Sequence, residues 1–597
     1  MADDTLARMF WNRVEQSRDR VAQEFKQGGT WRQLPWREYG QIVRELALGL
    51  LALGRRQGDA IAILSASRAE WVQADFAIFS AGCVTVPIYP SYTPEQIAYI
   101  ISDAEAKTLI VENVDQLQKA LQVRGKMEGL EQIVVMDGPS NDAGFILTWE
   151  ELKRRGREAA PNLESLLKER VRSVGPDDVA TIVYTSGTTG PPKGVVQTHG
   201  NHMAMIRAVR QVVDVTEQDK NLLFLPLAHS FARCDAFVAV YAGVTTAFAE
   251  NLDKVGENLR EVSPTYFASV PRVFEKVYAK VLAGVEAGSH AKKKIFYWAL
   301  GVGRQVSQRQ QRRQPIPFGL KLRYRLAHKL VFSKLHAAVG GRLQFANSGG
   351  APLAKEIAEF FHAVDILIVE GYGLTETCPA LTVNRRDQFK FGSVGKALPG
   401  VELRIAPDGE ILARGPNIAT RGYFKKPEAT AEVFDQDGWF HTGDIGLIDA
   451  DGFLFITDRK KDLIVTAGGM NIAPQNIENL LKTDPFISQA LVYGDRRPYP
   501  VALITLNPEE LQKFAIAQGL SSTDLGSLVR HPAIVQRVQA IVDARNGELQ
   551  SYSRIKKFSI LPNEFTQENG DLTPTLKLKR KIVVERQKAV LDSLYGA

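Results

Sequence analysis

The chain has 597 residues, which is too long for one ordinary domain and predicts a large domain joined to at least one more. Its apolar and charged fractions, 45% and 24%, are those of a soluble globular protein. The net charge of +7 is unevenly placed. Residues 290–342 carry thirteen Lys and Arg and no Asp or Glu, so the rest of the chain has a net charge of −6. This pattern excludes a general polyanion binder and indicates one anionic partner surface.

Several sequence features indicate where in the cell the protein is expected. No uncharged apolar run reaches about 18 residues, so no membrane-spanning helix is expected. The first eight residues are charged and lack a secretory apolar core, and the last five carry no prenylation or retention signal. Cys83, Cys234 and Cys378 are far apart and odd in number, which argues against a disulfide framework or zinc knuckle. We therefore expect a cytoplasmic protein with three small buried thiols.

The first 180 residues mix helical and strand patterns. Residues 1–59 are expected to be helical, ending at Gly54. Beyond them, short apolar runs alternate with helical patterns, and residues 138–178 form a polar, peripheral helical segment. The expected strands are 61–64, 84–89, 109–111 and 133–136; the expected helices are 68–81 and one capped by Thr93. This alternation predicts an α/β fold, with sheets flanked by helices on both faces.

The densest polar motif lies at residues 184–194, Tyr-Thr-Ser-Gly-Thr-Thr-Gly-Pro-Pro-Lys-Gly, directly after the apolar run 179–183. Glycines let backbone N–H groups approach a ligand closely, and such donors, with hydroxyls and one ammonium, suit a phosphate chain. The order is not that of the G-x-x-x-x-G-K-[ST] loop, because Lys193 follows Pro192 and precedes Gly194. The alternative is a flexible surface loop. The candidate phosphate-binding residues are Thr185, Ser186, Gly187, Thr188, Thr189, Gly190 and Lys193.

This motif resembles the phosphate-loop signature of the adenylate-forming superfamily, which includes acyl-CoA synthetases, luciferases and peptide-synthetase adenylation domains. The resemblance extends from about residue 30 to the C-terminus. It implies that the motif binds ATP, with Thr185 also among the catalytic residues. It further implies that His229 lies near the entry of the acyl substrate. The apolar run 222–228 is expected to be a buried strand ending at His229, and a histidine there can equally be a core residue.

Residues 346–353, Ala-Asn-Ser-Gly-Gly-Ala-Pro-Leu, are expected to form a tight turn before a helix. The resemblance places the adenine of ATP against this turn, at Gly350, Ala351 and Pro352. Paired glycines fit that role because they let the backbone come close to a flat base. The same residues are also compatible with an ordinary strand-to-helix loop.

A second strong motif, Gly-Tyr-Gly-Leu-Thr-Glu-Thr, begins at residue 371, after an expected strand at 366–370. The resemblance gives each polar residue a part in binding ATP. The glycines, including Gly373, free the ring of Tyr372 to lie flat against a purine. Thr375 can donate to the α-phosphate, and Glu376 offers a hard oxygen ligand to Mg²⁺.

Residues 392–457 change to short strands with hairpin turns at 407–409 and 449–452, which predicts a β-rich subdomain. It contains Asp444, in the motif His-Thr-Gly-Asp. A carboxylate accepts two hydrogen bonds, which suits a vicinal ribose diol. Without the resemblance, an Asp after Gly is a turn residue.

The resemblance divides the chain into an N-terminal domain, residues 1–457, that binds ATP and the acyl group, and a small mobile α+β domain, residues 458–597. Asp458 would be the hinge, and Arg459 would reach the nucleotide. As a bare charge run, this segment would be a solvated loop. The candidates for the CoA tunnel are Gly468 and Gly469.

The last motif, Leu-Thr-Pro-Thr-Leu-Lys-Leu-Lys-Arg, ends at Arg580. The superfamily has a catalytic lysine near this end, usually in Ser-Gly-Lys-[Ile/Leu]-x-Arg. Alignment on Arg580 assigns that role to Lys577 and puts Leu576 in place of the usual glycine. The form resembles the variant of long-chain fatty acyl-CoA synthetases. Lys579 is the rival candidate, and a basic strand end is the alternative without function.

Together these motifs predict activation of a carboxylate. ATP and the fatty acid would form an acyl-adenylate and pyrophosphate, with Lys577 and a Mg²⁺ ion on Glu376 offsetting negative charge, before coenzyme A attacks. The best match is a long-chain fatty acid–CoA ligase that releases AMP. One alternative is an adenylating ligase that passes the acyl group to a carrier protein. The other is a nucleotide-binding or membrane-docking protein without chemistry.

The basic region, residues 290–342, also carries interleaved aromatic residues. A basic amphipathic helix with aromatics is typical of a membrane interface, so we expect peripheral contact with an anionic membrane. The alternative is a solvated helical pair whose apolar face packs on the main domain. No motif that reads nucleic acid accompanies the charge, so no nucleic-acid partner is expected.

Overall fold

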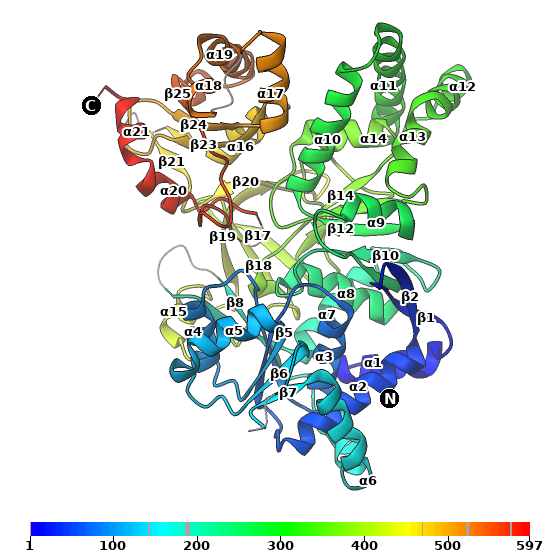
Figure 1. Cartoon of the computed structure of the whole chain (residues 1–597). Coiled ribbons are helices and arrows are strands. Elements are labelled where there is room, and N and C mark those ends of the chain that lie inside the picture. The colour runs from blue at the N-terminus through cyan, green and yellow to red at the C-terminus, as the bar shows by residue number, and fades with distance from the viewer. Residues whose placement is uncertain are drawn as a thin grey trace.

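Figure 1 shows the computed structural model of the chain. It describes residues 2–140, 144–185, 191–467, 470–520, 525–573 and 576–596. Two large sheets and the helices around them form most of the N-terminal part, a small β-rich unit follows, and a compact α+β unit ends the chain. The predicted α/β class is confirmed, and all three cysteines are buried and free.

Within the described residues, one of the large sheets has seven strands. In spatial order they are β7 (Ile146–Thr148), β6 (Gln132–Asp137), β5 (Thr108–Asn113), β3 (Ala60–Leu64), β4 (Val84–Ile88), β8 (Val179–Thr185) and β9 (Lys193–Thr198). All neighbours are parallel except β8 and β9. Every residue of β3 and β4 is buried, as expected for parallel strands covered on both faces.

Among the residues that the structure describes, the second large sheet has nine strands. They run β16 (Lys396–Ala397), β15 (Thr382–Val383), β14 (Ile368–Tyr372), β13 (Phe345–Ser348), β12 (Tyr266–Ser269), β10 (Lys220–Leu223), β11 (Thr245–Phe248), β1 (Val21–Gln27) and β2 (Thr30–Pro35). The helices of these two sheets are α1 (Leu6–Ser17), α2 (Trp36–Ala52), α3 (Ala69–Ser80), α4 (Pro94–Asp103), α5 (Val114–Gln122), α6 (Trp149–Ser173), α7 (His199–Arg210), α8 (Ser230–Ala242), α9 (Val255–Val262) and α14 (Lys355–Ala363).

The prediction that residues 1–59 are helical is wrong for residues 21–35. Strands β1 and β2 form a hairpin through Gly28 and Gly29, both with positive φ. Strand β1 also pairs in parallel with β11, so its burial comes from a strand more than 200 residues away. Local helical spacing in the flanking segments concealed this long-range pairing.

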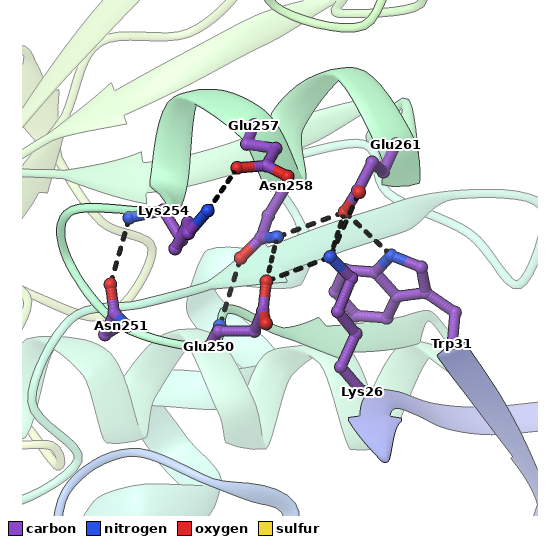
Figure 2. Close-up of polar contacts among 8 residues, drawn as sticks. All are labelled: Lys26, Trp31, Glu250, Asn251, Lys254, Glu257, Asn258 and Glu261. Carbon is purple, nitrogen blue, oxygen red and sulfur yellow. Dashed lines mark hydrogen bonds and ion pairs between the residues drawn. The ribbon is translucent and has the colours of Figure 1, made fainter. Parts of the chain in front are cut away.

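Figure 2 shows the polar contacts that hold this hairpin to α9 and the end of β11. The ammonium of Lys26 lies 3.0 Å from the carboxylate of Glu250 and 2.8 Å from that of Glu261. The indole N–H of Trp31 donates to Glu261 at 3.0 Å, and the amide of Asn258 bridges the two carboxylates. The N-terminal hairpin is therefore an integral edge of the nine-stranded sheet.

A buried ion pair joins the two large sheets. Arg233 of α8 is 1% exposed and donates to both carboxylate oxygens of Asp75 of α3 at 2.9 Å. It also donates to Thr181 of β8, and Thr85 of β4 donates to Asp75, each at 2.7 Å. The guanidinium lies within 6 Å of three aromatic rings, including that of Phe237. Helices from one sheet are thus fixed to strands of the other.

Two further expectations need correction. The strand expected to end at His229 ends at Leu223, because the segment after it turns and His229 instead caps α8. Residues 138–178 were expected to be a peripheral helical segment, but Ile146–Thr148 form β7, and α6, which is helical as predicted, is not simply peripheral. It packs so closely on α2 that a Cβ on Gly156 would lie 1.9 Å from the carbonyl oxygen of Glu45.

The predicted β-rich unit is confirmed as an antiparallel sheet of β17 (Glu402–Ile405), β18 (Glu410–Arg414), β19 (Phe440–Ile448) and β20 (Leu454–Arg459), with α15 (Pro427–Ala431) beside it. The C-terminal unit contains β21 (Ile464–Val465), β22 (Asn471–Ile472), β23 (Ile487–Tyr493), β24 (Val501–Leu506) and β25 (Lys557–Leu561). Its helices are α16 (Pro474–Leu481), α17 (Pro508–Ala517), α18 (Leu525–Leu528), α19 (Pro532–Asn546), α20 (Arg580–Arg586) and α21 (Lys588–Ser593).

The basic region lies in a helical lobe at the upper right of Figure 1. The lobe comprises α10 (Pro271–Glu286), α11 (His290–Gln311), α12 (Phe318–Ala327), the π-helical turn η2 (His328–Phe332) and α13 (Ser333–Ala338). The apolar side of α11, including Phe296, Leu300 and Val306, is buried. None of the described helices has both the length and the apolarity needed to cross a bilayer.

Candidate active site

The predicted site residues meet where the two large sheets, the β-rich unit and the C-terminal unit adjoin. Lys577 of the C-terminal unit interacts electrostatically with Glu376, Asp444 and Arg459. The positive charge of Lys577 also acts on His229, whose pKa it helps to lower. These five residues come from segments spread over almost 350 positions, and the fold brings them to one place.

Asp444 organises the nucleotide side of this site. It lies on β19 opposite Arg459 of β20 and is 3% exposed. One carboxylate oxygen accepts a hydrogen bond from the hydroxyl of Tyr372 at 2.7 Å, and the other lies 3.0 Å from Nε of Arg459. Burial, with the nearby Asp444 charge, raises the pKa of Tyr372, so the phenol stays protonated and donates. The carboxylate therefore fixes both the aromatic ring and the guanidinium.

Glu376 has a partner that sequence reasoning missed. Its Oε1 accepts a hydrogen bond from the hydroxyl of Tyr423 at 2.8 Å, and Nζ of Lys193 lies 5.1 Å from the centroid of the same ring. The backbone of residues 422–424 is bonded to β9 through Val196 and Gly194. Tyr423 thus links the lysine of the phosphate motif to the candidate metal ligand. Its sequence context, Arg-Gly-Tyr-Phe, gave no signal beyond an aromatic after a glycine.

The structure describes only the borders of the phosphate motif. Thr185 and Lys193 are opposite each other on β8 and β9, with the Thr185 hydroxyl 3.4 Å from the Lys193 carbonyl oxygen. The side-chain amide of Gln197 donates to the carbonyl of Thr375 at 2.6 Å, which fixes the second motif beside β9. The remaining candidates lie outside the described residues: Ser186, Gly187, Thr188, Thr189 and Gly190, and in the C-terminal unit Gly468 and Gly469.

The expected adenine turn follows β13. Gly350 has φ +82°, a value that favours glycine, and Ala351 and Pro352 follow it. The turn is held by Glu370 of the neighbouring strand β14, whose carboxyl accepts the N–H of Leu353 at 3.2 Å. Burial raises the pKa of Glu370 to about 8. Sequence reasoning treated Glu370 only as the end of a strand.

His229 caps α8, with Nδ1 accepting the N–H of Phe231 at 3.1 Å. Burial, with a smaller contribution from the Lys577 charge, lowers the pKa of His229 to about 3. The imidazole is therefore neutral at physiological pH, with its proton on Nε2. The ring of Phe231 lies close to Gly349, since a Cβ there would be 3.1 Å away. Phe231, two residues after His229, thus lies beside the adenine turn, and His229 is an uncharged polar group at the start of the same helix.

Lys577 follows a turn that contains Leu576, which has φ +61°. A left-handed backbone disfavours residues other than glycine, and glycine is the residue that the superfamily motif usually has at this position. The turn is closed by the backbone of Thr573, whose N–H donates to the Lys577 carbonyl at 2.8 Å. Burial and then the positive charge of Arg459 lower the pKa of Lys577 to about 8.

Polar contacts hold the C-terminal unit against α10 in this arrangement. Arg272 donates to the backbone and the hydroxyl oxygens of Ser488 at 2.6 and 2.7 Å. Lys482 lies 2.9 Å from the carboxylate of Glu275. Asp458, the expected hinge, is 1% exposed at the end of β20, and burial raises its pKa to about 6.

Comparison with known proteins gives concordant matches along the whole chain. Residues 10–424 match the family described as AMP-binding enzyme, and residues 461–597 match the AMP-binding enzyme C-terminal domain. The long-chain-fatty-acid–CoA ligase FadD15 of Mycobacterium bovis is 38% identical over 99% of this chain and 97% of its own. The ligase ACSBG2 of Rattus norvegicus, named for the same reaction, is 34% identical over 99% and 93%. The crystal structure of the anthranilate CoA ligase AuaEII with anthranoyl-AMP shares the fold, with a TM-score of 0.74, 20% identity and 98% coverage of both chains.

Proposed function

The chain belongs to the AMP-binding enzyme family, and on this premise we propose that it is a long-chain fatty acid–CoA ligase. It activates the fatty acid with ATP through an acyl-adenylate and transfers the acyl group to coenzyme A, releasing AMP and pyrophosphate. The observation that carries the proposal is the full-length likeness to ligases named for this reaction. The approach of Lys577 to residues of the N-terminal part supports it, because adenylation needs a cation where negative charge gathers.

In the first half-reaction, the carboxylate attacks the α-phosphorus of ATP, and pyrophosphate leaves. Lys577, assigned here as the catalytic lysine, stabilises the charge between carboxylate and phosphate. Tyr372 packs on the adenine, and Asp444 contacts the ribose, with Thr375 donating to the α-phosphate. The ring of Tyr372 is already oriented by its hydrogen bond to Asp444, so little ordering remains on binding.

Glu376 is the proposed magnesium ligand. Its carboxylate is half-buried among the phosphate-binding elements, and Tyr423 orients it through one oxygen. Hard oxygen donors of this kind suit Mg²⁺, which would neutralise phosphate charge when bound. Tyr423 then positions the ligand, and Lys193 adds a second cation beside it.

In the second half-reaction, the C-terminal unit rotates at Asp458 and coenzyme A attacks the adenylate. The polar contacts that must break include those of Arg272 with Ser488 and Glu564 and that of Glu275 with Lys482. Such contacts can exchange for water at small cost, unlike a large apolar interface. In this scheme the mobile domain begins at residue 458.

The direct test is product analysis with palmitate, ATP, Mg²⁺ and coenzyme A. We expect palmitoyl-CoA, AMP and pyrophosphate in equal amounts, and no product without Mg²⁺. ADP in place of AMP would refute the mechanism. Efficient transfer to a phosphopantetheinyl carrier protein, with only slow transfer to coenzyme A, would favour the alternative acceptor.

We also propose that the helical lobe docks on anionic membranes, with α12 as the contact. Along this helix, four apolar side chains recur every fourth residue and are exposed: Phe318 by 83%, Leu322 by 61%, Leu326 by 48% and Leu330, just beyond it, by 43%. Basic residues flank the stripe, namely Lys321, Arg323, Arg325 and Lys329. An exposed apolar stripe between cations is typical of a helix that lies in a membrane interface. The apolar side of α11, in contrast, packs on the main domain, as the alternative predicted.

Vesicle co-sedimentation tests this docking. Binding should need anionic lipid and weaken with salt, because exposed charges are screened. Replacing Phe318 and Leu322 with Ser should reduce binding. A control with Lys292 and Lys293 changed to Gln removes charge from α11 but leaves the stripe intact. Equal sedimentation with neutral and anionic vesicles, or unchanged binding of the Ser variant, would refute the proposal.

A further inference from the structure

Two histidines and one carboxylate converge at the base of the helical lobe, away from the candidate active site. His328 opens the turn η2, His336 lies in α13, and Asp365 is in the loop between α14 and β14. The Nε2 atoms of His328 and His336 lie 3.6 and 3.8 Å from the same oxygen of Asp365. One ligand atom from each residue lies within 4.8 Å of those of the others.

These distances match metal ligands better than hydrogen bonds. An N–H···O hydrogen bond between these groups would be about 2.7–3.2 Å long, so neither ring is bonded to the carboxylate. Two ligand atoms on a tetrahedral zinc ion, each about 2.0–2.1 Å from it, lie about 3.4 Å apart. In addition, Nε2 of His336 is buried and has no hydrogen-bond partner among the described residues. A buried ring nitrogen without a partner is costly unless something binds it.

The local backbone brings the two rings together. In an uninterrupted α-helix, residues eight apart are about 80° away from pointing in the same direction. The wider π-helical turn at residues 328–332 reduces this offset, and the ring centroids of His328 and His336 are 5.4 Å apart. π-Helical turns inside α-helices occur often at functional sites. Asp365 has φ +70°, a conformation that Asp tolerates better than most residues.

Tyr324, on α12, lies near the carboxylate of Asp365, and burial together with the Asp365 charge raises the pKa of Tyr324. Metal-binding carboxylates are commonly oriented by such a partner. The side chains of His328 and Asp365 are 39% and 45% exposed, so an ion can enter from solvent.

We propose that His328, His336 and Asp365 bind one divalent transition-metal ion of the zinc class, with water as the fourth ligand. Two imidazoles and one carboxylate suit Zn²⁺, Ni²⁺ or Cu²⁺, whereas Mg²⁺ prefers oxygen ligands alone. The ion would tie the end of the helical lobe to the loop before β14. The basic surroundings oppose a cation, so affinity should be lower than in a structural zinc site with four protein ligands.

Metal titration tests the proposal on the full chain, purified without a polyhistidine tag, stripped with a chelator and kept free of ATP. Zn²⁺, titrated in competition with a chromophoric chelator, should bind at one equivalent, and Co²⁺ should give the strong visible absorption of four-coordinate geometry. Asp365→Asn tolerates the same backbone and removes the charge, and His328→Gln removes an exposed ligand. Each should weaken Zn²⁺ binding at least tenfold, and Tyr324→Phe should weaken it less.

Three controls make the result decisive. His290→Gln changes an exposed histidine of the same lobe and should bind Zn²⁺ as the parent does. Glu376→Gln removes the proposed magnesium ligand and should still bind one equivalent of Zn²⁺ tightly, because the two sites are separate. Zn²⁺ should raise the melting temperature of the parent but not of Asp365→Asn, whose metal-free melting temperature reports correct folding. If the parent binds no equivalent of Zn²⁺ tightly, or if Asp365→Asn and His328→Gln bind Zn²⁺ as tightly as the parent, the proposal is overturned.

Discussion

The pH dependence of adenylation provides the sharpest test of Lys577. Burial and Arg459 lower the pKa of this ammonium to about 8, while the carboxylates of Asp444 and Glu376 oppose the shift. The charged form, which adenylation needs, is therefore present below pH 8 and is lost as the pH rises above it. Because kcat/KM reports ionisations of the free enzyme, kcat/KM for ATP should fall about tenfold per pH unit on the alkaline side.

Two substitutions separate charge from position at this residue. Lys577→Ala removes the cation and should slow adenylation by about 10²- to 10³-fold, or about 2.7–4 kcal/mol, as loss of a preorganised electrostatic group does. Lys577→Arg keeps the charge, and a guanidinium stays protonated to a pH of about 12. The alkaline loss of kcat/KM should then disappear, even if the longer side chain lowers the rate.

The assay measures the half-reactions separately. ATP–pyrophosphate exchange with palmitate follows adenylation, and preformed palmitoyl-adenylate with coenzyme A follows thioester formation. Lys577→Ala should lose the first and keep the second, because the rotated C-terminal unit no longer places the lysine at the site. An unchanged alkaline loss in Lys577→Arg, or equal slowing of both half-reactions, would refute the reasoning. If the matched control Lys579→Ala gives the split instead, the lysine assignment is wrong by two residues.

Three further predictions concern stability and are read by chemical or thermal unfolding. Arg233→Met leaves the Asp75 carboxylate buried without its partner and should lower the free energy of unfolding by about 3–5 kcal/mol, with partial recovery when Asp75→Leu is added; no loss would show that the pair does not join the sheets. Asp235 lies buried in α8, where burial raises its pKa to about 7, so its contribution to stability is lost as the pH rises from its unfolded pKa, about 4, through 7. Asp235→Asn does not titrate, so its melting temperature should exceed that of the parent more at pH 8 than at pH 5, and an equal difference at both would contradict the assignment. Leu576→Gly relieves a left-handed backbone and should stabilise the C-terminal unit by about 1 kcal/mol, whereas a lower melting temperature would mean that the leucine side chain contributes more than the strain costs.

Local sequence patterns predicted those helices and strands that neighbouring residues in the chain specify. The strand at 61–64 is a run of apolar residues, and it is β3, buried on both faces. Thr93 was expected to cap a helix, and it does so in α4, where both halves of a capping box with Gln96 form. The β1–β2 hairpin was not predicted because β1 pairs along its edge with β11, and no local pattern encodes the position of that strand.

The residues of the candidate site also differ in whether a local pattern could predict them. Continuous motifs identified Lys193, Glu376 and Asp444, because resemblance works on residues that are consecutive in the chain. Tyr423 was missed because its role depends on Glu376, 47 residues earlier, and on a backbone bridge to β9. Contacts of this kind are made by the tertiary fold, so only the structure reveals them.

The pairing of β19 with β20 has a consequence for the order of events in turnover. Asp444 faces Arg459 across this ladder, one position from Asp458. A rotation at Asp458 would withdraw Arg459 and Lys577 together, leaving Lys193 as the remaining cation beside Asp444 and Glu376. The pocket would thus attract phosphate less strongly. The motion that admits coenzyme A would also loosen AMP, so the departure of the spent nucleotide would be timed by the same swing that completes the thioester.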